Sequence, residues 1–319
     1  MGHLEQGRWT DKWFVTRDES GHFIRSDSGF RNWITPDGSP GPSGEGGFTA
    51  EAGRYHLYVA MACPWAHRTL IFRKLKGLEE LIPISVVDPK MPDETGWNFA
   101  AKDGGTPDPV NGADFLWQIY TKAVPDYTGR VTVPTLWDKK QKTIVSNESS
   151  EIIRMFNSAF DGLTGNMLDF YPEALRPRID EINTRIYNAI NNGVYKAGFA
   201  TTQTAYEEAV TELFDALDWV ESLLADNRYL TGDTLTEADW RLFPTLVRFD
   251  AVYYAHFKCS RRRIADYPRL SGYLKELYNH PGIAGTVDLD QIRLHYYWSH
   301  ESINPHRIVP VMPDLAFLK

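Results

Sequence analysis

The feature that most constrains the fold of this chain is a strand–helix–strand pattern in residues 55–87. Residues 55–60 predict a strand, residues 64–76 predict a helix closed by Gly77, and residues 81–87 predict a second strand. The joints between these elements are short. The pattern therefore predicts a βαβ unit in which the two strands run parallel.

The elements that follow extend this unit. Residues 88–112 are rich in Pro, Gly and Asp and indicate a long loop. A helix over 113–124, a β-hairpin over 130–145 and a helix over about 149–160 are predicted next. The first domain is therefore expected to run βαβ, then α, ββ, α.

Past residue 165 the hydrophobic period becomes helical, which predicts amphipathic helices. Thr236 is predicted to cap a further helix, with Asp239 at its third position. A length of 319 residues suggests two domains at about 150 residues each. We expect an N-terminal arm (1–50), an α/β domain (51–165) and an all-α domain (166–319). The helices are predicted from apolar residues spaced alternately by four and three positions. These residues are Leu175, Ile179, Ile182, Ile186 and Ala189, then Tyr206, Val210, Leu213, Leu217, Val220 and Leu224.

Charge and composition exclude several functional classes. The net charge of −8 argues against nucleic acid or an anionic membrane as the main partner. No stretch approaches 18 uncharged apolar residues, and the N-terminus lacks an apolar signal core, so we expect a soluble, cytoplasmic protein. The two cysteines, Cys63 and Cys259, cannot form a disulfide framework or a four-cysteine zinc site, and we expect no metal.

Cys63 carries most of the chemical information. Pro64 suits the first position of a helix, which places Cys63 at or near the N-cap, facing unpaired amide N–H groups. The positive end of the helix dipole there favours a thiolate, so we predict a lowered pKa for Cys63. Ala66 stands where a second cysteine of a Cys-x-x-Cys motif would be. A mixed disulfide at Cys63 must therefore be cleared by an external thiol.

A second group of residues suits the α-amino-acid end of a ligand. Val133-Pro134 interrupts a strand, and a cis peptide there would expose the Val133 backbone to an extended ligand. Glu148 can bind an ammonium group, and Ser149 at a helix start can bind a carboxylate. Read alone, these residues are also compatible with ordinary helix capping.

Together these motifs resemble the thioredoxin-fold half of cytosolic glutathione transferases, and the second half resembles their helical domain. The chain is most similar to the xi class, the glutathionyl-hydroquinone reductases, over nearly its whole length. The stretches that carry this resemblance are Phe30-Arg-Asn-Trp33, Cys63-Pro-Trp-Ala-His-Arg68, Gly129-Arg-Val-Thr-Val-Pro134, Ser146-Asn-Glu-Ser149, Asn192-Gly-Val-Tyr-Lys-Ala-Gly198, Val247-Arg-Phe-Asp250, His295-Tyr296 and Ile303-Asn-Pro305.

The resemblance implies a thioredoxin-like glutathione-binding domain, a reaction, and roles for named residues. Glutathione, the co-substrate, would bind along Val133, Glu148 and Ser149 with help from Trp97 and Arg130. Cys63 would attack the glutathione sulfur of an aromatic glutathionyl-hydroquinone, and a second glutathione would resolve the mixed disulfide. The phenol-binding tyrosines would be Tyr195, Tyr253 and Tyr296, with Tyr195 and Tyr296 also catalytic. The resemblance further implies a homodimer through the helical domain.

Two other functions fit parts of the pattern. An omega-like thiol transferase or dehydroascorbate reductase would also use a lone thiolate at a helix start. A binding protein on a transferase scaffold would carry the same Cys-Pro motif and would need no lowered thiol pKa. The arm and the tyrosines favour the reductase.

Overall fold

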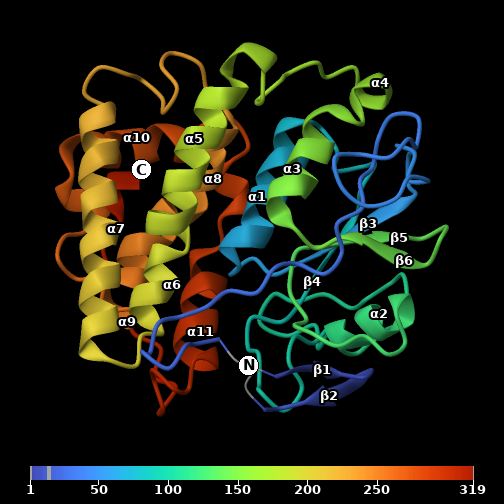
Figure 1. The fold of residues 1–319 in the computed structure, drawn as a ribbon, viewed down its shortest axis with the longest axis horizontal. Coiled ribbons are helices and arrows are strands. Elements are labelled where there is room, and N and C mark those ends of the chain that lie inside the picture. Colours follow the sequence, from blue (N-terminus) through green and yellow to red (C-terminus); the bar gives the residue numbers. More distant parts are fainter. Residues whose placement is uncertain (1, 13–15, 319) are drawn as a thin grey trace. The chain divides into compact units, whose positions relative to one another are not determined.

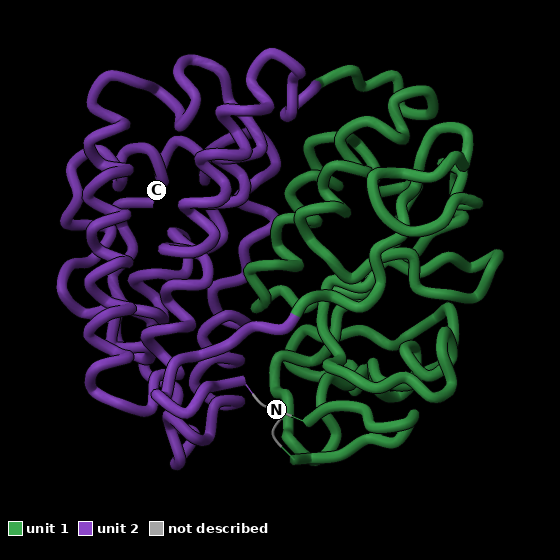
Figure 2. The backbone as a smooth tube through the Cα atoms, in the orientation of Figure 1, with its two compact units in different colours: residues 1–14, 27–168 green, residues 15–26, 169–319 purple. Residues whose placement is uncertain are grey.

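The computed structural model describes residues 2–12 and 16–318 of the chain. It divides into two compact units, shown in different colours in Figure 2. Unit 1 comprises Met1–Phe14 and Asp27–Leu168, and unit 2 comprises Val15–Ser26 and Asp169–Lys319. The expected arm is thus shared between the two units rather than forming a third one.

Unit 1 contains a four-stranded mixed sheet with the strand order β4-β3-β5-β6. The strands β3 and β4 are parallel, which confirms the predicted βαβ unit, and β5 runs antiparallel to both β3 and β6. The bounds of the strands are β3 Tyr55–Val59, β4 Ile84–Val86, β5 Thr135–Asp138 and β6 Thr143–Ser146.

Two strands are shorter than the sequence suggests. Strand β4 begins at Ile84 instead of residue 81, because Ile82 N–H donates to the Leu78 carbonyl in a local turn at 2.8 Å. Strand β5 begins only after Pro134, which has no N–H to donate to a ladder.

Helices cover both faces of this sheet. Figure 1 shows α1 and α3 together on one side of it and α2 on the other. The apolar side of α1, including Ile71 and Phe72, is buried. This packing holds the start of α1 beside the end of strand β3. The bounds of these helices are α1 Pro64–Leu75, α2 Leu116–Ala123, α3 Ser149–Ser158 and the short α4 Asp161–Thr164.

Unit 2 is built from helices, which together with the mixed sheet of unit 1 confirms the predicted fold class. Two π-helical turns, η2 and η3, continue α5 and α8 without a break, and the sequence pattern did not indicate them. The principal elements are α5 Arg176–Ile186, η2 Tyr187–Asn191, α6 Gly193–Gly198, α7 Gln203–Leu223, α8 Glu237–Arg248, η3 Phe249–Tyr253, α9 Tyr254–His256, α10 Pro268–Tyr278 and α11 Leu289–Ser299. Short 3-10 turns occur at η1 Glu173–Leu175, η4 Ile264–Asp266, η5 Ala284–Thr286 and η6 Ala316–Leu318.

The start of α8 is fixed by the predicted cap. The Thr236 N–H donates to Asp239 Oδ2 at 2.8 Å, which confirms Thr236 as the N-cap residue. The same buried carboxylate accepts from the Leu230 N–H at 2.9 Å and from the Tyr273 hydroxyl at 2.8 Å. Asp239 therefore ties the helix start to the preceding loop and to α10.

The first residues form a hairpin that supports a loop of unit 1. Strand β1 (His3–Glu5) pairs with β2 (Arg8–Thr10), and Leu4 bridges to Gly129. The Trp9 indole lies against Gly96, where an added Cβ would come within 2.5 Å of the ring, and φ there is +66°. Only glycine satisfies both conditions, so the hairpin shapes the loop that carries Trp97.

Among the described residues, no helix combines the length and apolar character that a membrane span requires.

Candidate active site

Cys63 occupies the predicted position. It is the N-cap residue of α1, with φ −76° and ψ 123°, and Pro64 is the first helical residue. The Cys63 carbonyl accepts the His67 N–H at 3.0 Å, which begins the helical ladder. The thiol is partly exposed and is not part of a disulfide. A nucleophile is thus presented at the positive end of a helix, just beyond the strand that precedes it.

Val133 lies directly against this thiol. The Cys63 Sγ–H donates to the Val133 carbonyl, with a distance of 3.4 Å between sulfur and oxygen. The Val133–Pro134 peptide is cis, as the sequence allowed, and the Val133 side chain is buried. The backbone of residue 133 therefore borders the sulfur, where an extended thiol ligand can run alongside it.

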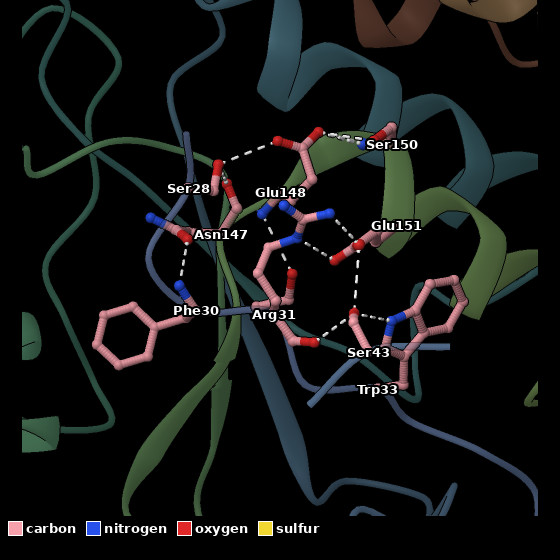
Figure 3. A network of polar contacts seen from close by, with 10 residues as sticks. Ser28, Phe30, Arg31, Trp33, Ser43, Asn147, Glu148, Ser150 and Glu151 are labelled. Carbon is pink, nitrogen blue, oxygen red and sulfur yellow. Dashed lines mark hydrogen bonds and ion pairs between the residues drawn. The ribbon is translucent and has the colours of Figure 1, made fainter. Parts of the chain in front are cut away.

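Glu148 and Ser149 form the second part of this site, at the start of α3. Glu148 is the N-cap residue, and its Oε1 accepts the Ser150 N–H at 2.9 Å and the Ser150 hydroxyl at 2.8 Å. Its Oε2 accepts the Ser28 hydroxyl at 3.0 Å. Figure 3 shows the carboxylate between these two serines, one from the arm and one from α3.

The surroundings of Glu148 keep it ionised. Burial by itself raises a carboxyl pKa, but the hydrogen bonds from Ser150 and Ser28, together with the charge of Arg68, outweigh burial and lower the pKa of Glu148. Arg68 is 2% exposed, and its Nη1 donates to the Ser149 hydroxyl at 3.4 Å. A half-buried anion and a buried cation therefore flank Ser149, which suits a zwitterionic amino-acid group.

The N-terminal arm is also bound to residues around the start of α3. Arg31 Nε donates to Glu151 Oε2 at 2.7 Å, and Arg31 Nη2 contacts the other carboxylate oxygen of Glu151. The Phe30 N–H donates to Asn147 Oδ1 at 3.1 Å. These contacts, drawn in Figure 3, hold Ser28 beside Glu148. The arm has no hydrophobic period, so nothing in its sequence pattern indicates that Ser28 meets Glu148.

Trp97 and Arg130 lie on loops of unit 1. Trp97 is 7% exposed, and its carbonyl accepts the N–H of Leu116, the first residue of α2, at 2.9 Å. Arg130 is partly exposed, and its carbonyl accepts the Tyr127 hydroxyl at 3.3 Å before β5. Their roles toward glutathione stay predictions.

In unit 2, the three predicted tyrosines share hydrogen bonds although they come from three separate helices. The hydroxyls of Tyr195 and Tyr296 are 2.6 Å apart, and those of Tyr253 and Tyr296 are 2.9 Å apart. Tyr296 is thus the centre of the cluster. Burial raises the pKa of both Tyr253 and Tyr296 well above 10, so their hydroxyls stay protonated at neutral pH. Tyr195 is the partly exposed member of the three.

The neighbouring tyrosines are placed differently. The Tyr297 ring packs against His256, with 4.7 Å between ring centroids, and the partly exposed Tyr254 begins α9. Tyr253 ends the π-helical turn η3, and such turns are often found at functional sites. Of these adjacent pairs, Tyr253 and Tyr296 are thus the tyrosines whose hydroxyls share the hydrogen bond described above.

Two buried histidines, His256 and His300, pack beside the tyrosine cluster. His256 Nε2 and His300 Nδ1 are 3.1 Å apart, and the His300 ring packs edge-on against Tyr296 at 5.3 Å. Burial, with contributions from Lys258 and His295, lowers the pKa of His256 to about 4. Burial, with His295 and His256, lowers the pKa of His300 well below 6.5. Both rings are neutral at pH 7.

A pH dependence of stability follows from His256. Its pKa is lower in the folded than in the unfolded chain, so it contributes stability that is present above pH 6.5 and is lost as the pH falls toward 4. We expect His256→Gln to reduce the fall in unfolding free energy between pH 7 and pH 5 by about 2 kcal/mol. Urea denaturation at both pH values measures this.

The exposed His306 provides the matched control. We expect His306→Gln to leave the fall in unfolding free energy as in the wild type. An equal fall in His256→Gln and wild type would contradict the assignment of His256 as a buried neutral ring.

Comparison with known proteins identifies the family. Residues 62–159 match the family model "Glutathione S-transferase, N-terminal domain", and residues 203–276 match "Glutathione S-transferase, C-terminal domain". Glutathionyl-hydroquinone reductase YqjG of Escherichia coli K12 is 58% identical over 98% of this chain and 95% of its own. An xi-class transferase structure from Natrialba magadii superposes with a TM-score of 0.90 at 49% identity, covering 100% of this chain and 95% of the other. The chain belongs to the xi class of glutathione transferases.

One further relative and one further solved structure agree with this assignment. Glutathionyl-hydroquinone reductase PcpF of Sphingobium chlorophenolicum is 55% identical to this xi-class transferase over 98% of the chain and 96% of its own length. The glutathione-bound structure of E. coli YqjG superposes with a TM-score of 0.92 at 54% identity in that alignment, covering 100% of this chain and 97% of the other. The resemblance found in the sequence is thereby confirmed.

Proposed function

We propose that this xi-class transferase removes glutathione from aromatic glutathionyl-hydroquinones and releases the hydroquinone and glutathione disulfide. The observation that carries the proposal is the 58% identity, over nearly the full length of both chains, to a protein named glutathionyl-hydroquinone reductase. The single partly exposed thiol of Cys63 and the tyrosine cluster supply the chemical groups that this reaction needs.

Unit 1 binds the glutathione part of the substrate. The ionised Glu148 pairs with the α-ammonium group, and the Ser149 hydroxyl with the amide groups at the start of α3 binds the α-carboxylate. The Val133 backbone, beside the Cys63 sulfur, pairs with the peptide of glutathione. Trp97 and Arg130 complete the binding of the tripeptide.

The reaction takes place in two displacements at sulfur. The Cys63 thiolate attacks the glutathione sulfur, forming a Cys63–glutathione disulfide and breaking the carbon–sulfur bond. The electron pair goes to the aromatic carbon, which takes up a proton, so the ring is reduced and the two sulfurs are oxidised. A second glutathione thiolate then attacks the mixed disulfide, restores the Cys63 thiolate and leaves as glutathione disulfide. Cys259 is not suited to resolve the mixed disulfide, because it is buried and burial raises its pKa.

The tyrosines act on the oxygens of the ring. Their hydroxyls are protonated donors, and a hydrogen bond to a phenolic or quinoid oxygen assists the tautomerisation that lets the carbon–sulfur bond break. Tyr195 is partly exposed and is the member that meets the substrate, while Tyr296 and Tyr253 support it.

We also propose that the protein acts in the cytoplasm as a homodimer assembled through its helical unit.

Substrate competition tests this function. Glutathionyl-benzohydroquinone with glutathione should be turned over faster than dehydroascorbate, with hydroquinone release followed by chromatography. A higher kcat/KM for dehydroascorbate would favour the omega-like thiol transferase instead. No turnover of either substrate, together with no depression of the Cys63 pKa by iodoacetamide titration, would favour a binding protein.

The contact between Ser28 and Glu148 gives a more local prediction. In Ser28→Ala, Glu148 loses the hydrogen bond to Oε2 and is held less firmly for the ammonium group of glutathione. A hydrogen bond to a charged group contributes about 1.5–3 kcal/mol, so we expect the KM for glutathione to rise about tenfold with little change in kcat. Steady-state kinetics with varied glutathione measure both constants.

Ser26, an exposed serine two positions earlier, is the matched control. We expect Ser26→Ala to keep the wild-type KM. A KM in Ser28→Ala that equals the wild-type value would mean that the arm does not hold Glu148 for glutathione.

A further inference from the structure

One segment of the arm packs on unit 2 rather than unit 1, and it is firmly attached there. The Thr201 N–H donates to the Gly21 carbonyl at 3.1 Å, and the Thr202 hydroxyl donates to the Ser20 carbonyl at 2.9 Å. Its two sides are also joined, since the Ile24 N–H donates to the Thr16 carbonyl at 2.7 Å. Residues 16–26 therefore form a hairpin-like element that is held by hydrogen bonds at the junction between α6 and α7.

This segment places a cation on the face of Tyr195. The Arg25 guanidinium carbon is 4.8 Å from the centroid of the Tyr195 ring and 5.3 Å from that of Phe23. Arg25 Nε donates to Asn192 Oδ1 at 2.8 Å, which anchors the side chain to the turn just before α6. The Phe23 ring stacks beside Tyr195, with 6.3 Å between centroids and 28° between planes.

Other charged and titratable groups act on Tyr195 or on its two tyrosine partners from the helices around them. Tyr296 of α11 shares a hydrogen bond with it, and Tyr253 of η3 lies beside it with 6.2 Å between ring centroids. Arg248, buried at the end of α8, acts electrostatically on Tyr253 and Tyr296. Arg25 is thus the cation that the arm adds to a cluster otherwise made by the helical core.

A cation on the face of a phenol ring is more strongly attracted when the ring carries negative charge. Tyr195 gains such charge whenever it gives its proton to an oxygen of the substrate, and the Tyr296 hydroxyl can then donate to the phenolate oxygen at the observed 2.6 Å. We propose that Arg25 is a positioning residue that fixes the Tyr195 ring and stabilises its phenolate during proton transfer to the aromatic substrate. This inference rests on the proposed function for the identity of the substrate.

Tyrosine ionisation tests the proposal without relying on turnover. The ultraviolet absorbance of tyrosinate is followed as the pH is raised. Subtracting the titration of Tyr195→Phe from that of the wild type isolates Tyr195, and the same subtraction is made in the Arg25→Gln background. We expect Arg25→Gln to move the Tyr195 midpoint to higher pH by on the order of half a unit to one unit. Arg25→Lys, which keeps a cation, should restore part of that shift.

Kinetics supply the second readout. We expect Arg25→Gln to lower kcat/KM for glutathionyl-benzohydroquinone about 5–10-fold, and to leave the reduction of a small glutathione mixed disulfide, which needs no phenol, within about twofold. Arg17→Gln, in an exposed position of the same segment, should behave as the wild type in both assays.

A Tyr195 midpoint that is the same in Arg25→Gln as in the wild type overturns the proposal. Failure of the proposed function is a separate result, because it would be seen as absence of turnover of the quinol adduct by the wild-type protein.

Discussion

We expect Cys63→Ala to lose nearly all release of hydroquinone from glutathionyl-benzohydroquinone. The physical reason is that no other thiol can replace it: Cys259 is fully buried and burial raises its pKa. Loss of a covalent nucleophile removes the lower-energy path altogether, and we expect turnover to fall by at least about a thousandfold. Chromatographic detection of the hydroquinone measures the residual rate.

Cys259→Ala is the control for this variant. We expect it to keep turnover within about twofold, since a buried cysteine behaves as a small apolar residue. Substantial hydroquinone release by Cys63→Ala would show that the thiol does not attack the substrate, and that the tyrosines or bound glutathione alone carry the reaction.

Tyr296→Phe has the second-largest expected effect. This change removes the hydroxyl that contacts both Tyr195, at 2.6 Å, and Tyr253, at 2.9 Å, while the ring keeps its packing. Positioned proton donors contribute roughly 10²–10⁴-fold to rate, so we expect kcat for the quinol adduct to fall about a hundredfold. Reduction of a small glutathione mixed disulfide, which needs only Cys63, should be nearly unchanged.

Tyr297 provides a matched control because it is the adjacent tyrosine on α11 and packs against His256 instead. Tyr297→Phe should retain wild-type turnover of the adduct. If Tyr296→Phe slowed both substrates equally, the cluster would be a structural element of the helical unit rather than part of the reaction.

These predictions depend on elements that were predicted from the sequence to very different degrees. The β3–α1–β4 unit was predicted because strand residues, Pro64 and Gly77 mark its boundaries locally. The N-cap position of Cys63 follows from the same local signal. The cap of α8 by Thr236 and Asp239 is also local, since its partners are three residues apart.

What could not be predicted depends on contacts that are remote in sequence. The π-helical turn that ends at Tyr253 has the same composition as an ordinary helix, so its periodicity gives no sign of it. Ser28 meets Glu148 across 120 positions, and Arg25 meets Tyr195 across 195 − 25 = 170 positions. The arm is divided between two different units, so no single packed face imposes a hydrophobic period on it.

The tyrosine cluster stands between these cases. Its members are 43 and 101 positions apart in the pairs that share hydrogen bonds, and only the resemblance to the xi class selected them from the 16 tyrosines of the chain. The geometry then supplies what the resemblance does not contain, namely that Tyr296 is the shared partner and that Arg25 lies over Tyr195.

The central claim is that Cys63 takes the glutathionyl group directly from the aromatic ring. A single-turnover reaction of the protein with glutathionyl-benzohydroquinone, without added glutathione, tests it by mass spectrometry of the intact protein and its peptides. We predict one hydroquinone released for each protein chain that gains one glutathionyl group on the Cys63 peptide, and release of glutathione disulfide once glutathione is added. Hydroquinone release without a glutathionyl group on Cys63, or no release until glutathione is added, would contradict this account.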